Sequence, residues 1–237
     1  MIIKAKQDLN EKLTYFGATK NELSILLNAI QIKQLNEGDI FCSTGSSKGI
    51  CYLASGTMIT RHNFGEGLEI ISSNKTNNTF VFTSFPDFIN ASRCDYICLE
   101  DASIIYWNPS LLKQILDNNL QLRQALLHIF MQELLFMTEL GYLRSLLSKR
   151  DYIIITMILM FSVDVKNKEP SYSVGQQIMC NHVGVTRQFY SSFIHDLEHK
   201  GIIKTEYKKI TLLSIAALKA ELSIDISSYF TEKLKGF

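Results

Sequence analysis

Clusters of turn-forming residues recur at short intervals through the first third of the chain. They are Asn36-Glu37-Gly38-Asp39, Gly45-Ser46-Ser47, Ser55-Gly56, Phe64-Gly65-Glu66-Gly67 and Ser73-Asn74-Lys75. Turns about 8 to 12 residues apart, with short apolar pieces between them, are typical of an all-β sandwich or barrel. We therefore expect strands near residues 40–42, 50–53, 58–60, 68–71, 79–82, 96–99 and 103–107.

Helical patterns flank this β region on both sides. Before it, residues 1 to about 30 carry apolar side chains at helical spacing. After it, the period changes at Asn108-Pro109-Ser110, where a helix is expected because proline suits the first helical turn. From residue 120 to 147, apolar residues recur at steps of three and four, which predicts one long helix.

The predicted long helix has two adjacent apolar stripes. The first stripe is Leu122, Leu126, Ile129, Glu133, Phe136, Leu140, Leu143 and Leu147, and the second is Leu120, Leu127, Leu134 and Gly141. Such a wide apolar face indicates two packing partners, which would be the β region of the same chain and a second copy of the helix. Packing within its own chain alone is the alternative.

The sequence of the last third of the chain predicts shorter helices and strands. A helix from Asp151 to about Val163 is followed by Pro170, a short strand, and a helix that Ser173 and Gln176 would open as a capping box. After the turn Val183-Gly184-Val185, a second helix is expected with Thr186 as its N-cap and Lys200-Gly201 as its end. These two helices form a helix-turn-helix, residues 202–213 form a hairpin wing, and a helix over 215–222 closes the chain.

The second helix of this motif has a polar flank that suits DNA. Arg187 can donate two hydrogen bonds to guanine, and Gln188 can pair with adenine in the same way. Phe193, Leu197 and, by its spacing, Phe189 are expected to face the core. The candidate DNA-binding residues are Thr186, Arg187, Gln188, Tyr190, Ser191, Ser192, His195, Lys204 and Lys208.

The composition of the chain limits its general class and its partners. The chain has 237 residues, 46% of them apolar, and a formal net charge of +1, so its overall charge does not indicate a nucleic-acid or membrane partner. Its five cysteines are an odd number without a signal peptide, which favours a reducing, cytoplasmic location. The apolar run over 152–161 is shorter than the roughly 20 residues that a membrane span requires.

The segment VGVTRQFYSSFIHDLEHKGII, residues 183–203, resembles the DNA-binding segment of the Crp/Fnr family of bacterial transcription regulators. Residues 35–41, 51–58 and 64–71 resemble the β-roll repeats of that family. The resemblance implies an α+β fold in three parts. These are an N-terminal β-roll (jelly-roll, cyclic-nucleotide-binding-like) domain over 1–108, a helix pair with a long dimerisation helix over 109–149, and a C-terminal winged helix-turn-helix over 150–237.

The same resemblance implies a function. The chain would be a homodimeric, sequence-specific transcription regulator, an activator, with double-stranded DNA, a second copy and RNA polymerase as partners. Two positions depart from the family pattern, because Gln188 replaces the usual Glu and Ser192 replaces the usual second Arg. We therefore expect the docking mode to be shared and the preferred DNA half-site to differ.

The ligand region departs further from the family. Members that bind cyclic nucleotides carry a Gly-Glu pair followed by Arg-Ser or Arg-Thr, whereas here Arg93 is followed by Cys94 and no Gly-Glu pair precedes it. The region resembles PrfA-type members, some of which respond to glutathione. We therefore expect the chain to bind no cyclic nucleotide and no metal, and a glutathione-like ligand is an open alternative. Cys94 and Cys98 are expected to be buried, inert thiols.

Two other classes of function compete with this one. In the first, the β-roll is a sensor or protein-interaction module and the helix-turn-helix is vestigial. In the second, the chain is an enzyme, but it has no Gly-rich phosphate loop, no His-Glu-x-x-His and no nucleophile elbow. A cupin-like enzyme would need clustered histidines, and the five histidines are scattered along the sequence. We therefore expect no enzymatic activity.

Overall fold

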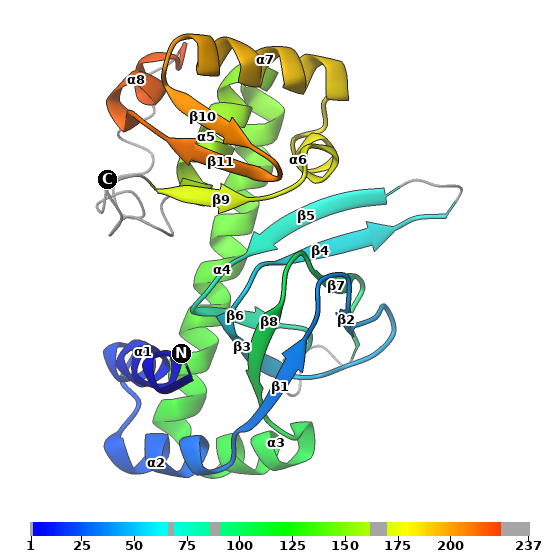
Figure 1. Cartoon of the computed structure of the whole chain (residues 1–237). Coiled ribbons are helices and arrows are strands. Elements are labelled where there is room, and N and C mark those ends of the chain that lie inside the picture. Colours follow the sequence, from blue (N-terminus) through cyan, green and yellow to red (C-terminus); the bar gives the residue numbers. More distant parts are fainter. Residues whose placement is uncertain (1, 66–68, 86–90, 162–169, 224–237) are drawn as a thin grey trace. The chain divides into compact units, whose positions relative to one another are not determined.

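The computed structural model describes residues 2–65, 69–85, 91–161 and 170–223. The chain divides into two compact units, residues 1–138 and residues 139–237, with the division inside a long helix. Figure 1 labels the elements in chain order.

The first unit combines helices with an eight-stranded β-roll. Its helices are α1 (Ile2–Tyr15), α2 (Lys20–Asn28), α3 (Pro109–Asn118) and the first part of α4 (Leu120–Leu146). Its strands are β1 (Gln31–Leu35), β2 (Ile40–Cys42), β3 (Ile50–Ser55), β4 (Met58–Asn63), β5 (Glu69–Lys75), β6 (Thr79–Phe82), β7 (Asp95–Cys98) and β8 (Ala102–Tyr106). All seven predicted strands are present, and β1 is an addition to them.

The strands form two antiparallel four-stranded sheets, in the orders β1-β8-β3-β6 and β2-β7-β4-β5. Most consecutive strands therefore lie in different sheets, which is the arrangement of a roll. Gly56 makes the turn that leads from β3 in one sheet to β4 in the other. Its φ is +96°, and a Cβ there would lie 2.7 Å from the Cβ of Ala102, so only glycine fits this turn.

The two middle strands of one sheet, β3 and β8, are buried on both faces. Cys51 and Leu53 of β3 point into the roll, where they pack with residues such as Met58 and Ile104. The alternate residues Ile50 and Tyr52 belong to a second apolar cluster, which includes side chains of the surrounding helices. Burial on both faces explains why β3 reads as a continuous apolar run rather than as an alternating one.

Trp107 follows β8 and belongs to the apolar cluster between the sheet and the helices. Its side chain is almost completely buried, and its indole N–H donates to the backbone carbonyl of Leu26 in α2, with an N–O distance of 2.9 Å. Leu9 and Leu13 of α1 and Leu122 of α4 belong to the same cluster. This tryptophan therefore links the end of the roll to the helices of the first unit.

Glu22 is a buried carboxylate that joins α2 to α4. Its Oε2 accepts hydrogen bonds from the Thr19 N–H at 2.8 Å and the Thr19 hydroxyl at 2.7 Å, which completes a capping box at the start of α2. Its Oε1 accepts from the Leu122 N–H at 3.1 Å. Burial alone would raise the pKa of the Glu22 carboxyl, but these hydrogen bonds outweigh it and hold the pKa below its ordinary value of 4.5.

We expect Glu22→Gln to lower the free energy of unfolding by about 1–3 kcal/mol at neutral pH, because charge-assisted hydrogen bonds are lost in a buried site. A carboxyl whose pKa is lowered by folding stabilises fully above its ordinary value and loses that effect as the pH falls through the lowered one. The difference between the two proteins should therefore shrink below about pH 4.5. Urea unfolding at several pH values measures this, with the exposed Glu11→Gln as control. A difference that stays constant down to pH 3 would contradict the assignment.

The second unit contains the end of α4, the helices α5 (Lys149–Phe161), α6 (Gln176–Val183), α7 (Arg187–His199) and α8 (Ile215–Ala220), and three strands. The strands β9 (Ser171–Ser173), β10 (Ile203–Glu206) and β11 (Lys209–Leu212) form an antiparallel sheet in the order β10-β11-β9. This is the winged helix-turn-helix that the sequence predicts. The expected end of α5 near Val163 lies outside the described residues.

The predicted capping box of α6 is wrong. Ser173 is the last residue of β9, and the N-cap of α6 is Gly175, which supplies no side-chain hydrogen bond. Ser173 pairs with Lys209 in the wing sheet, and α6 begins only at Gln176, so Ser173 lies too far before the helix to be its N-cap. Among the described residues, no helix is both long enough and apolar enough to span a membrane.

Candidate nucleic-acid interface

The turn between α6 and α7 is built by two residues whose roles the sequence predicts. Gly184 ends α6 in the left-handed conformation with φ of 72°, and its N–H donates to the Cys180 carbonyl at 2.8 Å. Thr186 is the N-cap of α7, where its hydroxyl accepts from the Phe189 N–H at 3.2 Å. This turn fixes where α7 begins, and so which side chains lie in its first turn.

The two sides of α7 differ in burial. Tyr190, Phe193, Ile194 and Leu197 are buried. Arg187, Gln188, Ser191, Ser192 and His195 are exposed on the helix, and the N-cap Thr186 lies at its start. The structure therefore places six of the predicted DNA-binding residues together on one polar side of the helix.

Two residues of α7 lie on the opposite side from the one expected. Tyr190, expected at the DNA interface, has 0% of its surface exposed and packs in the core, whereas Phe189, expected in the core, is 45% exposed. The buried face runs through residues 190, 193, 194 and 197, which places residue 189 about 90° from its centre at 100° per residue. Burial also raises the pKa of the Tyr190 hydroxyl to about 12.

The wing is a hairpin of β10 and β11 with the two-residue turn Tyr207-Lys208. Lys204 and Lys208, both predicted DNA-binding residues, are exposed on it. The Lys204 ammonium lies 2.9 Å from the Glu206 carboxylate, and the Lys208 ammonium lies 5.8 Å from the ring centre of Tyr207. Tyr207 is 90% exposed and was not among the predicted site residues, although its position at a hairpin tip beside two lysines is a signal that could have found it.

A groove with a volume of about 410 Å³ lies between the first turns of α6 and α7 and the wing. Its lining includes Gln176 and Gln177 from α6, Arg187 from α7, and Lys208 from the wing tip. Gly175 supplies no side-chain hydrogen bond to the first N–H groups of α6. The groove is therefore mostly apolar, with basic, acidic and polar side chains of three elements also in its lining.

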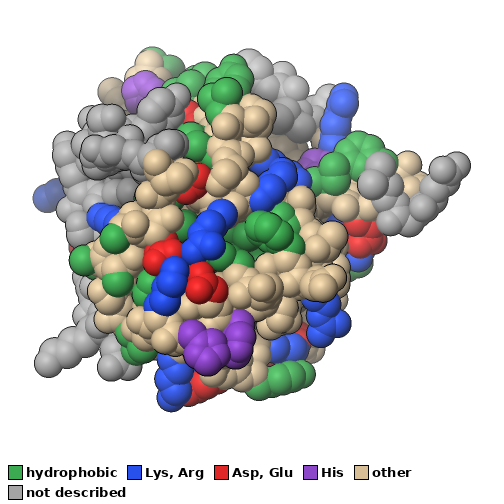
Figure 2. Space-filling model, turned by 90° about the horizontal axis from the view of Figure 1, so that it is seen from above, with side chains coloured by type: hydrophobic (Ala, Val, Ile, Leu, Met, Phe, Trp, Pro, Cys, Tyr) green, Lys and Arg blue, Asp and Glu red, His purple; other side chains and the backbone are tan. Residues whose placement is uncertain are grey.

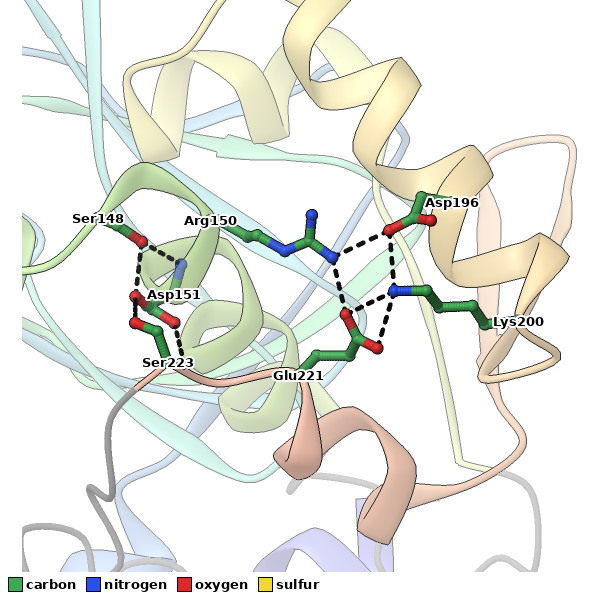
Figure 3. Close-up of polar contacts among 7 residues, drawn as sticks. All are labelled: Ser148, Arg150, Asp151, Asp196, Lys200, Glu221 and Ser223. Atoms are coloured by element: carbon green, nitrogen blue, oxygen red, sulfur yellow. Dashed lines mark hydrogen bonds and ion pairs between the residues drawn. The ribbon is translucent and has the colours of Figure 1, made fainter.

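A cluster of charged side chains holds α7 in place (Figure 3). One guanidinium nitrogen of Arg150, in α5, donates to Asp196 at 2.9 Å and to Glu221 at 2.7 Å. The Lys200 ammonium lies 2.9 Å from Glu221 and 3.2 Å from Asp196. The pKa values of the Asp196 and Glu221 carboxyls are lowered, most of all by hydrogen bonds from Lys200. The Arg150 guanidinium also stacks over the ring of Phe193, 4.9 Å from its centre. The cluster thus joins α5, α7 and the segment after α8.

Two histidines meet on α7, although all five look scattered along the sequence. The Nε2 atoms of His195 and His199 are 2.9 Å apart, and their ring centres are 4.2 Å apart. The sequence signal for this pair is His-Asp-Leu-Glu-His, in which the histidines are one helical turn apart. No group of three or more His, Cys, Asp or Glu side chains within the described ranges is arranged to hold a metal ion.

The β-roll side chains considered for ligand binding differ in burial. Arg93 is exposed, and Cys94 and Cys98 are both buried. Burial raises the pKa of both thiols, that of Cys98 to about 11, which agrees with the expectation of unreactive thiols. Residues 66–68 and 86–90, which belong to the segments compared with the family's β-roll and phosphate motifs, lie outside the described residues.

The long helix α4 carries an exposed apolar stripe. The exposed large apolar residues of α4 are Leu120, Met131, Leu134, Leu135, Tyr142 and Leu146. Leu122, Leu126, Ile129 and Leu143 are buried on the other side of the helix, as the first predicted stripe requires. Two members of the predicted second stripe, Leu120 and Leu134, are exposed, whereas Leu127 packs against the core of the first unit.

Comparison with solved structures shows a shared fold. FixK2 from Bradyrhizobium japonicum aligns with a TM-score of 0.73 over 83% of this chain and 98% of that chain, at 12% identity. The CRP-family transcriptional regulator TTHB099 from Thermus thermophilus aligns with a TM-score of 0.67 over 81% and 97%, at 14% identity. The c-di-GMP responsive global regulator CLP from Xanthomonas campestris aligns with a TM-score of 0.65 over 83% and 100%, at 14% identity. No family model and no curated protein matches the chain.

Proposed function

We propose that the chain is a DNA-binding transcription regulator of the Crp/Fnr family that acts as a homodimer and has no enzymatic activity. The observation that carries this proposal is the exposed polar side of α7, which begins at a capped first turn and lies beside a basic wing. The shared fold supports it. In this proposal residues 1–108 are the sensor, 109–149 the dimerisation region, and 150–237 the DNA-binding domain.

In the proposed complex, the first turn of α7 enters the major groove. Arg187 donates two hydrogen bonds to the N7 and O6 of guanine, and Gln188 pairs with adenine. Thr186, Ser191, Ser192 and His195 extend the contact along the helix. Because Ser192 is short and neutral, it cannot reach a guanine as an arginine would, and this is why we expect a different half-site from that of other members.

Phosphate contacts would come from the edges of the same surface. Lys204 and Lys208 on the wing supply positive charge. The N–H groups at the start of α6, which receive no side-chain cap from Gly175, favour an oxyanion, because they lie at the positive end of the helix dipole. These contacts fix position and orientation on the duplex and carry no sequence information by themselves.

A homodimer would form through the exposed apolar stripe of α4. An apolar stripe along a helix is the surface by which two long helices pair. The two copies of α7 would then enter successive major grooves about 34 Å apart, so the DNA site should be a palindrome or nearly one. Cytoplasmic location, activation of transcription and contact with RNA polymerase belong to the same proposal.

The β-roll would sense a signal other than a cyclic nucleotide. The sequence supports this, because Arg93 is followed by Cys94 in place of the Ser or Thr of the pair that holds a cyclic phosphate in the family. A glutathione-like ligand remains the named alternative. Recovery of bound DNA from a random pool, with and without cell extract, identifies the site and shows whether a small molecule is required.

Arg187→Ala is expected to weaken binding to the selected site by about 1–3 kcal/mol, because a bidentate base contact is lost. Discrimination at the base pair that Arg187 reads should be lost with it. Fluorescence anisotropy at fixed salt measures both effects. Arg93→Ala is the matched control, since it removes the same charge from an exposed site in the other unit. Equal affinities for Arg187→Ala and the unaltered chain would remove Arg187 from the readout.

The alternative function is a sensor or interaction module with a vestigial helix-turn-helix. The mixed charge of α7 and the wing favours it, since Asp196, Glu198 and Glu206 lie among the basic residues. If the random pool yields no enriched sequence even at low salt, where phosphate contacts are strongest, the alternative is preferred.

A further inference from the structure

His195 and His199 stand one turn apart on the exposed side of α7. Their Nε2 atoms are 2.9 Å apart, and the ring planes cross at 80°. Figure 2 shows histidine side chains, in purple, at more than one place on this face, and the largest purple group is exposed. The contact is a hydrogen bond between the two rings, in which one Nε2–H donates to the other Nε2. The two nitrogens are therefore already brought together without another group between them.

The separation of the two nitrogens fits a metal chelate. Imidazole nitrogens bind divalent transition metals at about 2.0–2.1 Å. At that bond length, two nitrogens at a right angle about the metal are roughly 2.9 Å apart, and at the tetrahedral angle roughly 3.3 Å. The observed distance matches the right angle, which is the geometry of tetragonal or octahedral ions.

We propose that His195 and His199 form a binding site for a divalent transition-metal ion, with Ni²⁺ and Cu²⁺ preferred to Zn²⁺. Each ring would bind through the lone pair of its Nε2. The ring that donates the present hydrogen bond would carry its proton on Nδ1 instead, and no oxidation or reduction is involved. Water would fill the remaining coordination positions, because within the described part of the chain no third side chain joins the pair.

Neighbouring side chains hold the helix that carries this histidine pair. Asp196 and Lys200, the neighbours of the two histidines in sequence, belong to the charged cluster that holds α7 to α5, so the backbone between the rings is fixed. Both rings are exposed, and binding therefore requires no opening of the structure. A preformed pair on a fixed helix loses little conformational freedom when the ion binds.

Glu198 adds a negative charge close to the pair. Its Oε1 accepts hydrogen bonds from the Thr205 N–H at 2.8 Å and the Thr205 hydroxyl at 2.6 Å. The Glu198 side chain is thus held toward the wing by Thr205 and is not one of the ligands of the pair.

The order His-x-x-Glu-His is also that of one class of zinc peptidases, in which the glutamate is the general base. Here Glu198 is held by Thr205 on the wing, and the structure offers no third protein ligand among its described residues. The arrangement therefore supports binding of an ion rather than hydrolysis. Metal binding at this pair does not depend on DNA binding and is tested without DNA.

Isothermal titration of the full chain with NiCl₂ at pH 7.5, in a buffer that does not bind metals, tests the site. We expect one Ni²⁺ per chain. His195→Gln and His199→Gln should each weaken binding at least about tenfold, because half of the protein ligands are lost. His128→Gln removes a histidine from another helix and should leave binding unchanged. Mg²⁺, which prefers oxygen ligands, should not bind at this site.

A rescue variant separates chelation from a general effect of losing a histidine. Ser191 is exposed and lies one turn before His195, so Ser191→His in the His199→Gln background rebuilds a pair at the same spacing. We expect Ni²⁺ affinity to recover. Circular dichroism checks that all variants remain folded. Equal Ni²⁺ binding by the unaltered chain and the His195→Gln/His199→Gln double variant, or no recovery in the rescue variant, would overturn the proposal.

Discussion

A chain that carries Leu135→Glu is expected to be monomeric and to bind its DNA site about 10²–10⁴-fold more weakly than the unaltered chain. The loss has this size because two linked recognition helices bind one DNA molecule with an avidity that a single helix lacks. Leu135 is 60% exposed in the single chain and lies in the middle of the apolar stripe of α4. A carboxylate there would be buried without a partner between two helices, which is strongly unfavourable.

Sedimentation equilibrium measures the oligomeric state, and anisotropy on the selected DNA measures affinity. Leu111→Glu is the matched control, because Leu111 is an exposed leucine on α3, outside the stripe. That control should stay dimeric and keep its DNA affinity. A dimeric Leu135→Glu protein would place the contact between copies elsewhere on the chain.

Trp107→Ala is expected to lower the free energy of unfolding by about 3–5 kcal/mol. The side chain is almost fully buried among residues of the sheet and of the helices, so its removal leaves a large cavity. The carbonyl of Leu26 also loses the indole hydrogen bond. A loss of this size is a large share of the total stability of an ordinary domain.

Trp107→Phe separates the two contributions. It keeps an aromatic ring in the cluster and removes the N–H, so we expect a loss clearly smaller than that of the alanine variant. Because Trp107 is the only tryptophan, unfolding in urea is followed by circular dichroism instead of fluorescence. A loss below about 1 kcal/mol for Trp107→Ala would mean that this cluster contributes little to the stability of the first unit.

Local chemistry made much of the fold predictable. The clusters of turn-forming residues predicted seven strands at their correct positions. Gly184 and Thr186 predicted the helix-turn-helix, because one ends α6 and the other caps α7. The strand β1 was missed because four of its five residues are exposed, so no apolar alternation marks it. It is held by pairing with β8, which is distant in sequence.

The misassigned site residues depended on geometry that spacing alone does not give. Phe189 and Tyr190 differ by a single 100° step, and which of them is buried depends on how α7 is rotated against the rest of its unit. The histidine pair was missed because each histidine was judged alone rather than with its neighbour one turn away. Tyr207 was missed because an exposed aromatic ring at a hairpin tip has no periodic signal.

The burial of every thiol gives the chain a built-in set of reporters. Four cysteines, Cys42, Cys51, Cys94 and Cys98, lie in the β-roll, and Cys180 lies in α6. All five are free and buried, so an alkylating reagent reaches a sulfur atom only when the structure around it opens. Mass spectrometry can compare the labelling rate of Cys180 with the rates of the other four cysteines. These rates report local opening of each unit separately, without any engineered probe.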